Sequence, residues 1–329
     1  MNQQHKTIDA KTQGLARLLQ AEYRYIELFR DDLIAHQMIE LIAKRSIEQS
    51  ENGTESFYYW VAGELRGALF RYPKEFLNFG VEGDELVIAL SPDDSGALEW
   101  ATQLILSLEW SKQRVTLGKI SGYHQALIPT LYQVGMGIDA LGLIGETQVA
   151  LEQIQRYYAV SNTLSSLGLT LATLDDSTID DVVSLRERCF KRAPEYCWFG
   201  ANPDHLILHR ERLASDIMGP HAWFVILKGK QLVGHFGSAV TFGNPMWGPV
   251  GGLELYFDED FRGMGIGKFA YQHTLSCLLK HGAQRFKGVT AQKSVMHLSR
   301  QMGRQLFEIH LRNDPFFPAE HFSSYLRHQ

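Results

Sequence analysis

Cysteine is scarce in this chain of 329 residues. Cys189, Cys197 and Cys277 are odd in number and contain no CxxC pair. A disulfide framework and a zinc site are both disfavoured, because each needs paired or clustered cysteines. We therefore expect a reducing compartment and no bound metal.

Long apolar runs and an excess of basic residues are also missing. No apolar stretch approaches the roughly 18–20 residues that cross a bilayer, and the polar N-terminus lacks the apolar core of a signal peptide. Lys and Arg number 32 against 37 Asp and Glu, a net charge of −5. Nucleic-acid-binding proteins normally carry a basic stripe. These absences predict a soluble cytoplasmic protein that binds neither membrane nor nucleic acid.

A duplicated layout is the main feature of the sequence. The composition is globular, with 45% hydrophobic and 21% charged residues, and the length favours two domains. A strand, a tight turn and a second strand occur at 56–72 and again at 221–240, where Gly67 and Gly234 lie 167 residues apart. Later landmarks keep nearly this spacing: strands ending at Ser91 and Asp258, amphipathic helices at about 97–111 and 267–281, strands beginning near Arg114 and Arg285, and helices ending at Gly135 and Gly303.

The Ser-rich stretch 159–169, which ends in Gly-Leu, separates the two copies. Residues 10–49 and about 176–215 have helical patterns, so each copy begins with helices. A generic series of strand and helix units would reproduce only some of the shared landmarks. The sequence therefore predicts two domains, 1–160 and 161–329.

The most informative segment lies after the strand that ends at Asp258. It reads RGMGIGK and opens a helix that contains no Gly or Pro until Gly282. Three alternating glycines let the backbone bend and approach a ligand closely, and the helix start offers unpaired N–H groups with about half a positive charge. Two flanking cations add full charges, so the segment predicts a pyrophosphate cradle. Its residues are Arg262, Gly263, Met264, Gly265, Ile266, Gly267 and Lys268.

Two other phosphate-binding motifs do not match this segment. A Walker P-loop needs Gly where Arg262 stands and Ser or Thr where Phe269 stands. A dinucleotide fingerprint needs an acidic residue about twenty positions after the glycines, where this chain reads FKGVTAQK. A glycine-rich turn without any ligand remains the alternative, but it does not explain glycines placed between two cations at a helix start.

The arrangement Arg262-x-x-Gly265-x-Gly267 resembles the R/Q-x-x-G-x-G/A signature of GNAT acyltransferases. As in that family, it follows a strand and opens a helix; the resemblance covers about 170–312 well and the first half only in layout. It implies an α/β fold of the α+β type, with two GNAT-like domains that each have a mixed, mostly antiparallel sheet flanked by helices. It also implies acetyl-CoA or another acyl-CoA as co-substrate, with its pantetheine arm along Tyr256 and Phe257 and its pyrophosphate on 262–268.

The resemblance suggests catalytic residues as well. Acyl transfer to an amine needs a base, because an amine with a pKa near 10 is mostly charged at neutral pH. In the family a carboxylate on the central strand often serves, and Glu254 has that place; a merely paired strand residue is the alternative. The family's acid is usually the Tyr of L-Y-x-x-x-G-F, where this chain has Ser299, and Arg304 replaces the Phe. Gln292 is the nearest substitute for the family's Asn and is assigned to the cofactor.

The acceptor site is expected in residues 189–205, between two helical stretches. Tyr196, Trp198 and Phe199 would form an apolar or cation–π wall there, or else ordinary interhelical packing. The expected reaction is the transfer of acetyl to a primary amine of a small molecule, by direct attack in a ternary complex. An N-acyl amino acid synthase with a longer acyl chain, and a non-catalytic acyl-CoA-binding regulator, remain alternatives.

The first half lacks the cradle. At the 167-residue offset, Ser95, Leu98 and Trp100 stand where the second half has Arg262, Gly265 and Gly267. The two acidic residues just before them would repel a phosphate. The first half is therefore predicted to be a degenerate copy that shapes the acceptor cleft and stabilises the fold, and one coenzyme A is expected per chain.

Overall fold

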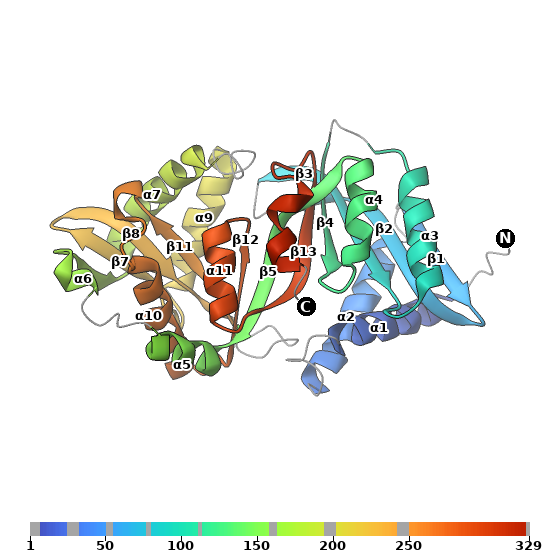
Figure 1. Ribbon diagram of the computed structural model, residues 1–329, viewed down its shortest axis with the longest axis horizontal. Coiled ribbons are helices and arrows are strands. Elements are labelled where there is room, and N and C mark those ends of the chain that lie inside the picture. Colours follow the sequence, from blue (N-terminus) through green and yellow to red (C-terminus); the bar gives the residue numbers. More distant parts are fainter. Residues whose placement is uncertain are drawn as a thin grey trace.

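A computed structural model describes residues 7–24, 33–50, 55–76, 80–110, 114–157, 163–193, 202–241 and 250–326. Helices and strands of mixed sheets form an elongated molecule, with the two halves of the chain at opposite ends (Figure 1). The α/β fold class expected from the sequence is confirmed. Among the described helices, none combines the length and hydropathy that crossing a membrane requires.

The first half places two helices before a strand hairpin and then alternates strands with helices. Ala62 and Gly63 have positive φ (50° and 84°), as the two-residue turn of a hairpin requires. Asp94 caps the following helix by accepting a hydrogen bond from the Ala97 N–H at 3.1 Å. The elements are α1 (Ile8–Arg24), α2 (Leu33–Ser50), β1 (Glu55–Val61), β2 (Glu64–Phe76), β3 (Val81–Leu90), α3 (Ser95–Ser107), β4 (Val115–Ser121), α4 (Ile128–Gln133), β5 (Met136–Glu146) and α5 (Thr147–Tyr157).

The second half repeats this order. Its helix α9 begins at Pro203 behind the cap residue Asn202, whose side chain accepts a hydrogen bond from the backbone N–H of Asp204. The elements are α6 (Thr163–Ser166), β6 (Thr170–Thr173), α7 (Ile179–Arg192), α9 (Pro203–Asp216), β7 (Phe224–Lys228), β8 (Gln231–Gly237), β9 (Val240–Thr241), β10 (Val250–Gly252), β11 (Glu254–Phe257), α10 (Ile266–Lys280), β12 (Arg285–Thr290), α11 (Lys293–Gln301), β13 (Gln305–Asn313) and α12 (Ser323–Leu326).

The strand register confirms the duplicated layout in detail. In the first hairpin Tyr59 pairs with Gly67, and in the second Ile226 pairs with Gly234, so both partners are shifted by 167 residues. A bulge follows each of these pairs at the equivalent position. A shared irregularity is harder to obtain by chance than a shared strand, so the two halves are copies of one unit.

The two copies exchange their last strands. The larger sheet has the order β1-β2-β3-β4-β13-β5-β12-β10-β9, so β13 of the second half lies between β4 and β5. In return β5 of the first half pairs with β12 of the second. The smaller sheet has the order β11-β8-β7-β6. Each copy therefore completes the other's sheet, and the boundary near residue 160 stays a prediction.

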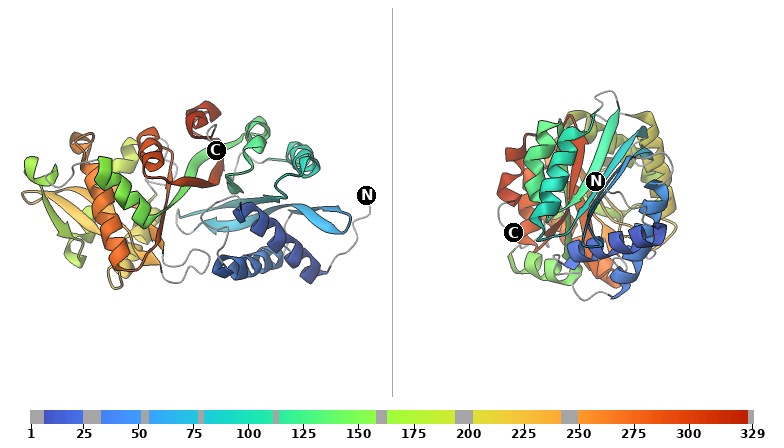
Figure 2. Two further views of the ribbon diagram at one scale, coloured as in Figure 1. Left: turned by 60° about the horizontal axis from the view of Figure 1, so that its bottom comes forward. Right: turned by 90° about the vertical axis from the view of Figure 1, so that its right-hand side faces the viewer.

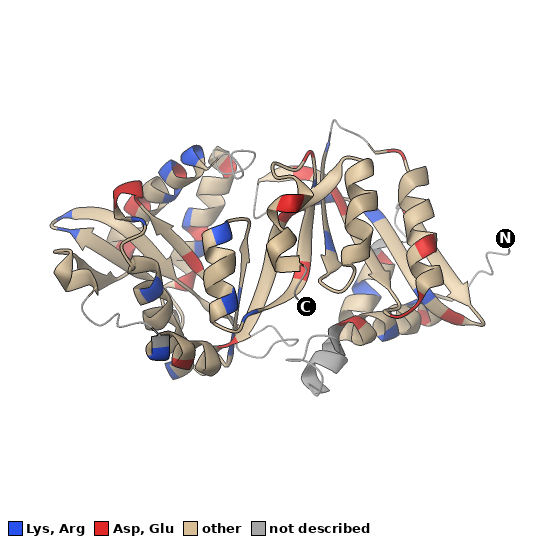
Figure 3. Ribbon diagram, viewed as in Figure 1, with Lys and Arg blue, Asp and Glu red and all other residues tan. Residues whose placement is uncertain are grey.

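The helices cover the sheets in two layers (Figure 2). On one face, α3, α4 and α11 bury the largest core cluster, and α10 buries a second against both sheets. On the opposite face, α1 packs on β2 and β3 while α7 packs on β8 and β11. Figure 3 shows Lys and Arg interspersed with Asp and Glu along the described elements of both halves.

Candidate functional site

Residues 250–257 leave one sheet and join the other. β10 pairs in parallel with β12, whereas β11 pairs antiparallel with β8. The last bond to β12 is donated by the Leu253 N–H to the Lys287 carbonyl at 2.9 Å. Beyond that bond the strands separate, and the sheet is splayed between β11 and β12.

The splay exposes one edge of β11. The Asp258 N–H donates to the Val233 carbonyl of β8 at 3.0 Å. Because backbone groups of an antiparallel pair alternate in direction, those of Tyr256 also face β8, whereas those of Leu255 and Phe257 face the splay. Within the described ranges, the Leu255 N–H and C=O and the Phe257 N–H have no hydrogen-bond partner. An extended ligand can pair with such an edge.

The predicted cradle lies at the start of α10, as expected. Gly263 and Gly265 have positive φ (77° and 83°), which favours glycine at both positions. A Cβ added at Gly263 or Gly267 would meet no described atom within 4 Å, so the space beside the loop is open. The five consecutive N–H groups from Gly263 to Gly267 have no acceptor in the described chain, and the helix bonds begin with the Lys268 N–H donating to the Gly265 carbonyl. The loop therefore offers a row of N–H donors at a helix N-terminus.

Arg262 joins the cradle to the open edge of β11. Its Nε donates to the Phe257 carbonyl at 3.1 Å, and its Nη2 lies 3.9 Å from the Cys189 Sγ. The Cys189 thiol donates to the same carbonyl at 3.6 Å. Burial raises the pKa of the Cys189 thiol, although the positive charge of Arg262 lowers it in part. Cys189 is therefore a packing thiol that helps to fix the loop.

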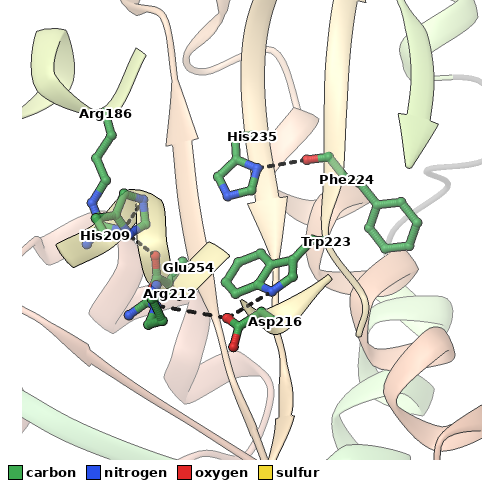
Figure 4. A network of polar contacts seen from close by, with 8 residues as sticks. All are labelled: Arg186, His209, Arg212, Asp216, Trp223, Phe224, His235 and Glu254. Carbon is green, nitrogen blue, oxygen red and sulfur yellow. Dashed lines mark hydrogen bonds and ion pairs between the residues drawn. The ribbon is translucent and has the colours of Figure 1, made fainter. Parts of the chain in front are cut away.

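Glu254 lies in a polar network between β11 and the helices α7 and α9 (Figure 4). Arg186 of α7 donates to one carboxylate oxygen at 2.7 Å, and Arg212 of α9 donates to the other. Burial alone would raise the pKa of Glu254, but the charges of Arg186 and Arg212 hold it well below its usual range. The side chain predicted as a base is therefore a firmly ionised carboxylate, and its catalytic role stays a prediction.

The same network holds His209 in its neutral form. Arg186 Nη1 lies 2.7 Å from both ring nitrogens of His209, and a guanidinium can only donate. Burial, followed by the charge of Arg186, strongly lowers the pKa of His209. The guanidinium lies over the rings of Phe190 and Tyr256, 5.0 and 4.7 Å from their centroids. Arg186 is thereby held by stacking as well as by its ion pair.

His235 stacks between Trp223 and Tyr256, with ring centroids 5.2 and 6.5 Å away. Its Nδ1 donates to the Phe224 carbonyl at 3.1 Å, while its Nε2 has no partner among the described residues. Burial lowers the pKa of His235 to about 4. Neither His235 nor the arginines beside Glu254 were predicted from the sequence. The one signal for them was the spacing of His209 and Arg212, three positions apart on one helix face.

The remaining predicted residues lie apart from this network. Ser299 is fully buried on α11 and accepts a hydrogen bond from Arg304 Nη1 at 3.0 Å. Arg304 Nη2 donates to the Leu143 carbonyl of β5 at 2.8 Å. Gln292 precedes α11, and its N–H donates to the Thr290 Oγ1 at 3.1 Å. The roles proposed for Ser299 and Gln292 stay predictions.

The predicted acceptor wall lies outside the described residues. Tyr196, Trp198 and Phe199 fall in the gap between residues 193 and 202.

The first half closes the site that the second half leaves open. The Leu90 N–H, equivalent to that of Phe257, donates to the Glu22 Oε1 at 3.0 Å. The same buried oxygen lies 2.5 Å from the His124 Nε2. Trp100 fills the space beside Gly67, where a Cβ would come within 2.7 Å of the indole. Side chains of the chain itself thus occupy the edge where a ligand would pair.

Residues 179–303 match the family model of the acetyltransferase (GNAT) family. A GCN5-related N-acetyltransferase from Sphaerobacter thermophilus is similar in structure, with a TM-score of 0.54, 14% identity and 93% of both chains covered. One from Kribbella flavida matches at 0.44 and 14%, covering 88% of this chain and 98% of that one. A tandem GNAT protein from the clavulanic acid biosynthesis pathway matches at 0.41 and 13%, covering 90% and 95%.

A search of curated proteins finds no match. At such low identity the likeness to solved structures concerns the fold alone, and the first of them extends it over both halves. The family match contains the splayed strand, the cradle and the network around Glu254. Residues 179–303 therefore form a domain of the acetyltransferase (GNAT) family.

Proposed function

We propose that the second half of the chain is an acyl-CoA-dependent N-acyltransferase. It would transfer acetyl from acetyl-CoA to a primary amine of a small molecule, by direct attack in a ternary complex. The observation that carries this proposal is the five consecutive N–H groups without acceptors in the described chain, from Gly263 to Gly267, beside the open edge of β11.

The site fits acyl-CoA in two places. Unpaired N–H groups at a helix start suit a pyrophosphate, and Arg262 and Lys268 add positive charge. The Leu255 and Phe257 backbone groups suit the amides of a pantetheine arm, since both run in the same extended direction along the splay. Tyr256, predicted for this role, would contribute through its packing against Arg186 instead.

Acyl-CoA supplies an acyl carbon activated as a thioester. The transfer forms a C–N bond, breaks the C–S bond, and moves one proton from the amine to water or to the departing thiolate. Each Glu254 oxygen has one arginine donor and can accept one more hydrogen bond, so Glu254 can hold and orient the amine. Its lowered pKa makes it a weak base, and we infer that the amine loses its first proton before it attacks.

A second candidate is a protein that binds acyl-CoA without turnover. Ser299 is buried and bonded to Arg304 where the family usually has a tyrosine acid, and two arginines neutralise Glu254. These two observations favour binding without chemistry.

The two candidates differ in the release of free thiol. Acetyl-CoA and one longer acyl-CoA are each incubated with a panel of primary amines, and thiol is measured with time. The proposal predicts amine-dependent release that a folded Gly265→Asp variant has lost. Calorimetric binding of acetyl-CoA with no release across the panel would support the binding protein instead.

A further inference from the structure

Gly252 and Lys287 lie side by side where β11 leaves β12. They are register partners of the parallel pair β10 and β12. Phe286 belongs to the core beneath α10, so Lys287 projects from the opposite face, which is also the face of Glu254. Glu254 follows Gly252 by two residues, about 7 Å along the chain, at the point where β11 begins to separate from β12.

Among the described residues of the second half, none covers this part of the face. A Cβ added at Gly252 would meet no described atom within 4 Å. In the first half, Glu85 stands at the position equivalent to Gly252. Glu85 pairs with Leu117, as Gly252 pairs with Lys287. Tyr72 and Lys74 both donate to the Glu85 carboxylate there. Side chains thus fill this position in the copy that lacks the cradle, whereas the copy with the cradle has bare backbone and a lysine.

Lys287 has no ion-pair partner within the described ranges. The acidic group that acts on Lys287 is Glu308. The Glu308 Oε1 lies 2.5 Å from the His310 Nε2 and 4.0 Å from the Lys119 Nζ. Burial would raise the pKa of Glu308, but His310 and Lys119 bring it down to about 2, so it stays an anion held by other partners. Burial lowers the pKa of Lys287 itself, and Glu308 offsets this only in part. A half-buried ammonium without its own partner favours a bound anion.

We propose that Lys287 binds an acid group of the acceptor, so that the acceptor is an amine with a carboxylate or phosphonate on the carbon that bears its nitrogen. The amine end lies at Glu254 and the acid end at Lys287, over the bare backbone of Gly252. An α-amino acid or an α-aminophosphonate carries its ammonium and its acid group on one carbon. Such a compound can therefore bind Glu254 through the ammonium and Lys287 through the acid group. This inference rests on the proposed acyl transfer and names the substrate class for the same site.

The test compares three acceptors that share one side chain: an α-amino acid, its decarboxylated amine and its aminophosphonate analogue. The wild type should favour at least one of the two acids over the simple amine by at least about tenfold in kcat/KM. Lys287→Met should abolish that preference by raising KM for the acid while kcat changes little. The acid with the higher kcat/KM decides between carboxylate and phosphonate.

Lys228→Met is the control, because it removes one exposed positive charge from β7 of the smaller sheet, away from both Lys287 and Glu308. It should leave the preference for the acid unchanged. Equal rates for acid and amine in the wild type, or a preference that survives in Lys287→Met, would overturn the assignment of Lys287 and leave acyl transfer standing. Thiol release with none of the three acceptors or the amine panel would overturn both the assignment and the proposed function.

Discussion

At the scale of single residues, the pairing of Glu254 with two arginines decides what that side chain contributes. Arg186 is nearly withdrawn from water, with 8% of its side chain exposed against 19% for Glu254 and 43% for Arg212. Removing the carboxylate would leave Arg186 buried with no opposite charge. Removing one partner of a buried ion pair lowers the free energy of unfolding, because the other charge stays buried without an opposite charge.

We predict that Glu254→Gln lowers the free energy of unfolding by about 2 kcal/mol at pH 7, less than for a fully buried pair because Arg212 is partly exposed. Denaturant unfolding measures this. Glu259→Gln is the control: its carboxylate is 69% exposed and lies 3.4 Å from Arg192, so its loss should change stability very little. A Glu254→Gln variant as stable as the control would show that the ion pairs do not stabilise the fold.

The difference in unfolding free energy between wild type and Glu254→Gln should depend on pH, because the pKa of Glu254 is lowered in the folded protein. A carboxylate with a depressed folded pKa stabilises the protein above its unfolded pKa, about 4.3, and this contribution is lost as the pH falls through the folded value. The stability difference between wild type and Glu254→Gln should therefore be constant from pH 6 to 8 and shrink below about pH 4. Unfolding curves at pH 7 and pH 3.5 test it; an equal difference at both would contradict the account.

The sequence predicted a role for Glu254 but not its two arginine partners. Glu254 was predicted because the GNAT family often has a catalytic carboxylate on the equivalent strand. Arg186 and Arg212 come from two helices, and which way they face depends on how those helices pack on β8 and β11. Sequence periodicity shows that a helix has an apolar face, but not which polar residue at its margin meets a strand.

At the scale of elements, the cradle was predictable because it is local. Glycines, flanking cations and a helix start lie within seven consecutive residues, and the structure keeps them together at the start of α10. The open edge of β11 was less predictable. It depends on the separation of β11 and β12, which lie about 30 residues apart in the sequence. The alternating pairing of β11 with β8 leaves the backbone groups of Leu255 facing the splay, in addition to the N–H of the predicted Phe257.

We predict that Gly265→Asp weakens acetyl-CoA binding by at least about 100-fold, because it places a negative charge among the N–H groups that we propose bind the pyrophosphate. Gly282→Asp is a close control, because Gly282 follows the other end of α10 and has a φ of 78°. A Cβ added at Gly282 would meet no described atom within 4 Å, and one added at Gly265 would make only an ordinary contact of 3.8 Å with Thr163. Both variants carry similar backbone strain, so both should lose similar stability in thermal unfolding. Only Gly265→Asp should lose affinity in calorimetry; equal affinity in the two variants would remove the cradle from the site.

At the scale of the whole molecule, the exchanged strands make the two copies interdependent. β13 lies between β4 and β5, and β5 lies between β13 and β12. The sequence indicated the duplication through its spacing, which the register bears out. It could not indicate the exchange, because β5 and β13 have the same pattern of apolar residues whichever copy they join.

We predict that neither 1–160 nor 161–329 folds alone, since each would expose long unpaired strand edges. Expressed together, the two fragments should form a complex that unfolds cooperatively. Circular dichroism and size-exclusion chromatography of each fragment and of the mixture test this. A folded, monomeric 161–329 fragment that binds acetyl-CoA would show that the exchange is dispensable.

The most direct test of the whole account is a calorimetric titration of the full chain with acetyl-CoA. The second half has an open β11 edge and unpaired cradle N–H groups, while in the first half Glu22 accepts from the Leu90 N–H and Trp100 covers Gly67. We predict saturation at one equivalent of acetyl-CoA per chain. Two equivalents would show that the first half also binds the co-substrate, and no binding at all would contradict the assignment of the cradle to acyl-CoA.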